Sequence, residues 1–159
     1  MNQAAWTAIL VGGGIAALAD GLMASIFWRV AKGVSWQRVF QGVASGLLGR
    51  EGAIAGGLAT ALLGVALHVF IALGMAAAFV LVSQRVPVLL RWPWPLVAPA
   101  YGVILLGAMH HVVLPLSRAG APSTWWPWVI ADWCTHLILV AMPIVLAARH
   151  WLVVAPARV

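Results

Sequence analysis

Residues 52–84 read GAIAGGLATALLGVALHVFIALGMAAAFVLVSQ and contain no Asp, Glu, Lys or Arg. About 20 apolar residues suffice to cross a hydrocarbon core of ~30 Å, so this stretch is long enough to span a bilayer. His68 lies at its middle. Every fourth residue around His68 is small, which gives the stripe Gly56, Thr60, Gly64, Ala72 and Ala76. Because small residues at this spacing let helices approach closely in lipid, the stripe predicts a packing face that turns His68 into a helix bundle.

The composition places the rest of the chain in the membrane as well. Of the 159 residues, 64% are hydrophobic and only 8% are charged, whereas soluble domains carry about 25% charged residues. We predict an all-α fold, an integral membrane four-helix bundle, with spans at about residues 4–28, 53–83, 96–116 and 128–148 in one membrane domain, 1–159. No positively charged segment precedes the first span, so we expect a retained helix and not a signal peptide.

The connection between the first two spans predicts one more helix, at about residues 35–48. Its apolar residues recur at helical spacing opposite its polar ones, which is typical of a short amphipathic helix in the headgroup plane. The alternative is a solvated loop. The apolar residues are Trp36, Val39, Phe40, Val43 and Leu47, and the polar ones are Gln37, Arg38, Gln41 and Ser45.

The net charge of +6 does not indicate a nucleic-acid partner. A nucleic-acid reader gathers basic residues on one surface, and here they stand singly at the ends of spans. The expected partner is the lipid bilayer, with another membrane protein or a second copy of the chain left open. Positive residues are divided almost equally between the two membrane sides, so orientation stays open.

Besides His111, the spans contain five Asp and His residues: Asp20, His68, His110, Asp132 and His136. We name as side A the membrane side that carries the first and third connections, and as side B the opposite one. With four antiparallel spans, all five residues fall in the half of the membrane next to side A. Since a charge inside the bilayer costs several kcal/mol unless it is paired or hydrated, we predict that they share one polar cluster.

Local spacing refines this prediction. Asp20 shares a helix face with the small residues Gly12 and Ala16, which predicts a second packing stripe. Asp132 and His136 are four residues apart and therefore on one face, where the carboxylate can fix the imidazole tautomer. His110 and His111 point about 100° apart around a helix, and we favour His110 as the inward one.

Several functions fit such a cluster. We favour a non-enzymatic accessory or structural bundle in which these side chains join helices by hydrogen bonds, and we assign no catalytic residue. The alternatives are a proton, ion or small-solute pathway open to side A, and a haem or metal site with His68, His110 and His136 as ligands. Cys134 is expected to be a buried small hydrophobe. The methionines are expected to pack, with a copper path as the alternative: Met23, Met75, Met109 and Met142.

Three short motifs resemble the YagU-like small inner-membrane proteins of bacteria. They are Leu67-His68-Val69-Phe70-Ile71, Met109-His110-His111-Val112-Val113-Leu114-Pro115-Leu116, and His136 followed by Ala147-Ala148-Arg149. The resemblance covers the last three spans. It implies a multi-pass protein of the bacterial inner membrane with four helices, and it carries over His68, His110 and His136 as matching positions. It supplies no settled biochemical activity.

Overall fold

The computed structural model describes residues 1–154, and every regular element in that part of the chain is helical. Four helices are long and apolar enough to cross a membrane: Gln3–Lys32, Gly57–Arg85, Trp94–Leu116 and Trp126–Val153. The first two are α1 and α3. The third comprises α5 (Trp94–Ala108), η1 (Met109–Val113) and α6 (Leu114–Leu116); the fourth comprises α7 (Trp126–Cys134), η2 (Thr135–Val140), α8 (Ala141–Arg149) and η3 (His150–Val154). The predicted all-α four-helix bundle is confirmed.

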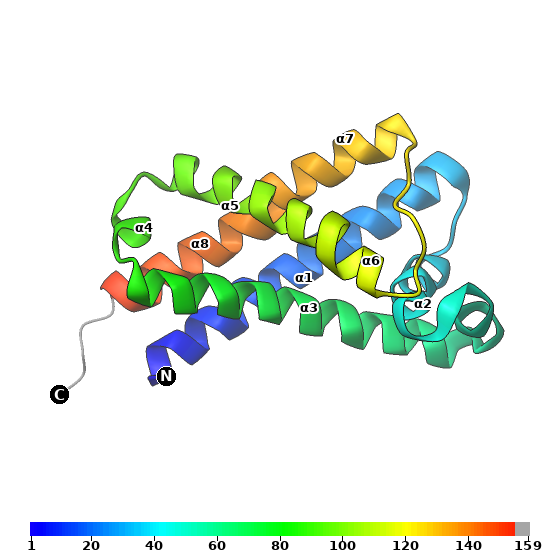
Figure 1. Ribbon diagram of the computed structural model, residues 1–159, viewed down its shortest axis with the longest axis horizontal. Coiled ribbons are helices and arrows are strands. Elements are labelled where there is room, and N and C mark those ends of the chain that lie inside the picture. Colours follow the sequence, from blue (N-terminus) through cyan, green and yellow to red (C-terminus); the bar gives the residue numbers. More distant parts are fainter. Residues whose placement is uncertain (155–159) are drawn as a thin grey trace.

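The four spans run in alternating directions between the two ends of the long axis of the molecule, which is horizontal in Figure 1. The N-terminus, the short helix α4 (Val88–Arg91) and the end of α8 lie at the side B end. Helix α2 (Trp36–Ala55) and the connection after α6 lie at the side A end. The first, third and fourth spans are longer than predicted, because residues at their ends also adopt helical geometry, whereas the second begins later than predicted.

Helix α2 corresponds to the predicted amphipathic helix. Gly49 interrupts it with a left-handed φ of 71°, so its first segment, 36–48, nearly matches the predicted 35–48. The chain then continues as a second helical segment to Ala55, and α3 begins only at Gly57. Residues 53–56, which we assigned to the second span and its packing stripe, therefore lie before α3.

The predicted polar face of α2 is only partly exposed. Gln41 and Ser45 are buried, whereas Trp36 and Leu47 are exposed. Gln41 Nε2 donates a hydrogen bond of 2.8 Å to the carbonyl of Gly57, and α2 packs along the first half of α3. The prediction of a helix with its whole polar face in water is therefore wrong for Gln41 and Ser45, because α2 packs against α3.

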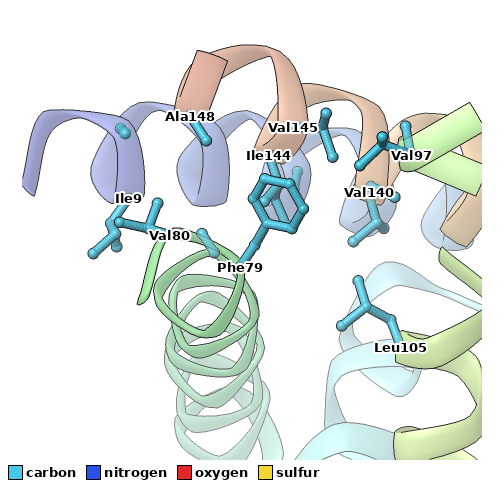
Figure 2. Packing of buried hydrophobic residues seen from close by; sticks show 14 of the residues in the cluster. Ile9, Phe79, Val80, Val97, Leu105, Val140, Ile144, Val145 and Ala148 are labelled. Carbon is cyan, nitrogen blue, oxygen red and sulfur yellow. The ribbon is translucent and has the colours of Figure 1, made fainter. Parts of the chain in front are cut away.

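The close-packed core occupies the side B half of the bundle. Figure 2 shows Phe79 and Val80 of α3 meeting Ile144 and Val145 of α8, with Ile9 of α1 beside them. Small residues make this packing tight: a Cβ on Gly12 would lie 3.0 Å from the Cβ of Ala147. This half of the bundle contains no ionisable cluster within the described residues, as its apolar sequence led us to expect.

Candidate functional site

The first polar pair joins α1 to α3. His68 Nε2 lies 2.9 Å from the carbonyl oxygen of Ala17 and 3.7 Å from Oδ2 of Asp20. A carbonyl can only accept, so Nε2 carries the hydrogen and donates to Ala17. The edge of His68 packs against the ring of Phe40 from α2, with centroids 5.6 Å apart.

The second polar group is built on Asp132 of α7. Its Oδ1 lies 3.2 Å from Nδ1 of His136, and its Oδ2 lies 3.4 Å from Nε2 of His110. His136 Nδ1 is also 3.0 Å from the main-chain oxygen of Asp132. One carboxylate therefore links the third and fourth spans, and His110 is the inward member of the His110–His111 pair, since His111 is exposed.

Both groups border one cavity of about 620 Å³. Asp20, His68, Asp132 and His136 contribute to its lining, whereas His110 is not among the lining residues. The sequence predicted a single polar cluster; the structure instead forms two His–Asp groups on the wall of a shared cavity. Asp20, Asp132 and His136 thus line the same cavity although they belong to different groups.

The cavity lies in the half of the bundle next to side A. Its lining begins at Val34 and Ala119 in the connections and ends at Ala16, Ala72 and Val140, near the middle of the spans. The walls are mainly apolar, and Trp28 and Trp128 lie among them. The cavity and the close-packed core therefore divide the bundle into two halves along its length.

Two π-helical turns carry the histidines that share Asp132. His110 lies in η1 and His136 in η2. Each turn comes shortly before a proline, Pro115 or Pro143, which lacks an N–H and pushes away the carbonyl four residues earlier. Such widened turns are frequent at functional sites. These π-helical turns were not predicted from the sequence.

Two glycines that sequence reasoning did not single out also shape the site. A Cβ on Gly102 would stand 2.8 Å from the carbonyl oxygen of His136, so α5 can approach η2 only with glycine there. A Cβ on Gly21 would stand 3.1 Å from the Phe40 ring and 3.4 Å from Nε2 of His68. The sequence alone does not reveal that these two glycines lie at close contacts, because glycine is common throughout membrane helices.

The predicted packing residues lie mostly at helix contacts. Gly12 and Ala16 are buried on α1, and Gly64 and Ala72 are buried on α3. Gly64 contacts the backbone of Phe40, where an added Cβ would stand 1.9 Å from the carbonyl oxygen.

The start of the stripe packs differently from our prediction. Gly56 is exposed at the junction of α2 and α3 and contacts Thr60. The Thr60 hydroxyl donates to the carbonyl of Ala53 at 2.5 Å, so both residues fasten α2 to α3 instead of joining two spans.

Predictions for the sulfur-containing residues are partly wrong. Cys134 is exposed on the outer surface of the bundle and is not a buried hydrophobe, because the turn that brings Asp132 and His136 inward directs residue 134 outward. Met75 and Met109 line the cavity, whereas Met142 packs against the core.

The histidines do not converge as a metal site would require. Among residues 1–154 there is no group of three or more His, Cys, Asp or Glu side chains arranged to hold a metal ion. The imidazoles direct one nitrogen each at a carboxylate or carbonyl oxygen.

These features define the class of protein. The chain is a small multi-pass membrane protein with four apolar helices and His–Asp pairs in its interior. Comparison with protein-family models, with curated proteins and with solved structures found no match to this chain.

Proposed function

We propose that this protein binds a small amphipathic molecule in the cavity next to side A, with the polar part of the ligand directed at the His–Asp pairs. The sequence left open a small-solute pathway, and this proposal differs from it in that the solute is bound and not conducted. One observation supports it over a purely structural bundle: about 620 Å³ beside the paired side chains is left unfilled. Ligand sites in proteins have volumes of about 300–1,000 Å³ and combine apolar walls with few polar groups.

The position of the cavity favours binding over conduction. A channel needs a polar route across the whole membrane, and the buried apolar core occupies the side B half. The cavity borders the connections on side A, so a ligand can arrive from water or from that leaflet. We therefore propose a non-enzymatic binding protein in which the side B half holds the helices together.

The proposed setting is the bacterial inner membrane, following the resemblance to YagU-like proteins. Kinship with that family is itself a proposal, carried by the motifs around His68, His110 and His136. The bilayer is the proposed partner, with another membrane protein or a second copy of the chain as alternatives, and no nucleic acid is expected. Haem or metal ligation by these histidines is a weaker proposal, since their nitrogens already face oxygen partners.

Calorimetric titration of the protein in lipid nanodiscs tests the proposal. The probes are 1-naphthylmethanol and protonated 1-naphthylmethylamine, which are small enough for the cavity, with empty nanodiscs as the blank. Ala24 lines the cavity, so Ala24→Trp fills it and should weaken binding at least about tenfold, the equivalent of about 1.4 kcal/mol.

Ile26→Trp is the matched control. It places the same side chain on the same helix, but at a position that is 61% exposed on the outer surface. We expect binding to this variant to equal that of the wild type. Absence of saturable binding of both probes, or equal binding to both tryptophan variants, would overturn the proposal and leave the accessory bundle as the better reading.

A further inference from the structure

We infer that the ligand is an organic cation, a protonated amine attached to an apolar body, which exchanges with protons at the cavity wall. This inference rests on the proposed function and names its ligand class. It follows from the hydrogen-bonding state of the polar atoms around the cavity, from the aromatic walls and from the charge of the two His–Asp groups.

Asp20 is the central observation. Among the described residues its ion-pair partner is His68, 3.7 Å away, and that imidazole nitrogen donates its hydrogen to Ala17 instead. Among the described residues no hydrogen bond to the Asp20 carboxylate is formed, yet no side-chain oxygen or nitrogen there is both fully buried and unpartnered. The carboxylate of Asp20 is therefore accessible from the cavity and lacks a donor. A ligand that brings N–H groups supplies what is missing.

The two neighbouring imidazoles also offer acceptors. His68 uses Nε2–H toward Ala17, and His136 uses Nδ1–H toward Asp132. In their neutral forms, the remaining nitrogens, Nδ1 of His68 and Nε2 of His136, carry lone pairs. Both residues line the cavity. These residues therefore present three acceptors to the cavity, which suits a ligand that brings N–H donors, such as an ammonium group.

The rest of the cavity suits the apolar body of such a cation. The rings of Trp28 and Trp128 lie 5.0 Å apart near side A, and Phe40 covers His68 from α2. Aromatic faces attract cations, most strongly where water is excluded. Nearby, the ammonium nitrogen of Lys32 lies 4.4 Å from the centre of the Trp125 ring. An ammonium group is therefore already held against an aromatic face beside Trp28 and Trp128.

Charge balance links binding to proton release. His68 on α3 pairs with Asp20, and Asp132 on α7 and His136 on η2 line the same cavity. Arg38 on α2 also lines the cavity, but it is exposed at the side A end, where water screens its charge. With neutral imidazoles the two carboxylates leave a net charge of about −2 inside the bundle, which is costly unless a proton or another cation compensates it. Without ligand, a proton shared by these groups reduces that charge. An entering ammonium ion takes its place, and the proton leaves to the water on side A.

The titration above separates this inference from the proposed function. The amine and the alcohol share the naphthyl body and differ in charge. We expect the amine to bind at least about tenfold more tightly, the equivalent of one charge-assisted hydrogen bond. Titration in two buffers of different ionisation enthalpy should show about one proton released per amine bound and none per alcohol.

Asp20→Asn should remove the preference for the amine, whereas Asp20→Glu, which keeps a carboxylate, should retain most of it. Glu51→Gln is the matched control, because Glu51 is an exposed carboxylate that does not line the cavity, and it should bind like the wild type. Equal affinity for the two probes, or amine binding without proton release in the wild type, would overturn the cation inference while leaving cavity binding intact. Loss of binding by both probes would overturn the proposed function itself.

Discussion

His136 directs Nδ1 at two oxygens of Asp132 at once, the carboxylate Oδ1 at 3.2 Å and the main-chain oxygen at 3.0 Å. Both are acceptors, so Nδ1 carries the hydrogen and the neutral ring presents Nε2 as an acceptor. The carboxylate thereby fixes the tautomer of His136 as well as its position. Its other oxygen faces His110 on the neighbouring span, so a single side chain orients two imidazoles.

Replacement of Asp132 by Asn should destabilise the bundle. Asparagine keeps one acceptor oxygen where two imidazoles each face an oxygen, so one of them loses its partner, which for a buried polar group costs about 1–3 kcal/mol. The free energy of unfolding, measured by denaturant titration in mixed micelles, should fall by that amount. Glu51→Gln, which removes an exposed carboxylate, should change it little; equal losses in the two variants would show that Asp132 has no special structural role.

The approach of α2 to α3 depends on Gly64. Gly64→Ala would place a Cβ 1.9 Å from the carbonyl oxygen of Phe40, and such overpacking costs about 1–3 kcal/mol. Gly74→Ala is the matched control on the same helix, since its Cβ would meet no atom within 4 Å. We expect lower thermal stability for the first variant only. Equal stability of both would mean that α2 does not pack on α3 as described.

Gly102 should control the position of His136 from the neighbouring span. Gly102→Ala adds a methyl group 2.8 Å from the main-chain oxygen of His136, whereas Gly107→Ala on the same helix meets nothing within 4 Å. In ¹⁵N-labelled protein, the imidazole resonances of His136 should shift in the first variant. They should stay in place in the second, and a comparable shift in both would argue against the contact between α5 and η2.

Metal analysis and a visible spectrum test the weaker proposal of haem or metal ligation. Because His68 pairs with Asp20 and Ala17 while His110 and His136 pair with Asp132, we expect neither a stoichiometric transition metal nor a Soret band in protein purified without chelators. A Soret band that disappears in His68→Ala or His136→Ala would show instead that the imidazoles rearrange around a cofactor.

The sequence by itself determined the membrane class, the four long apolar helices and the half of the bundle that holds the His–Asp groups. Each of these follows from local hydropathy and from counting helical residues, which need no knowledge of neighbours. The spacing of Asp132 and His136 also predicted their contact, because residues four apart share a helix face.

Only the tertiary structure decided which of the Asp and His side chains pair with one another and what surrounds the pairs. Pairing of Asp20 with His68 but of His110 with Asp132 depends on which spans are neighbours, and helical periodicity does not encode that choice. The same holds for the burial of Gln41 against α3 and for the outward position of Cys134. The cavity arises where α2, the π-helical turns and the spans fail to fill the space between them, so no local pattern could reveal it.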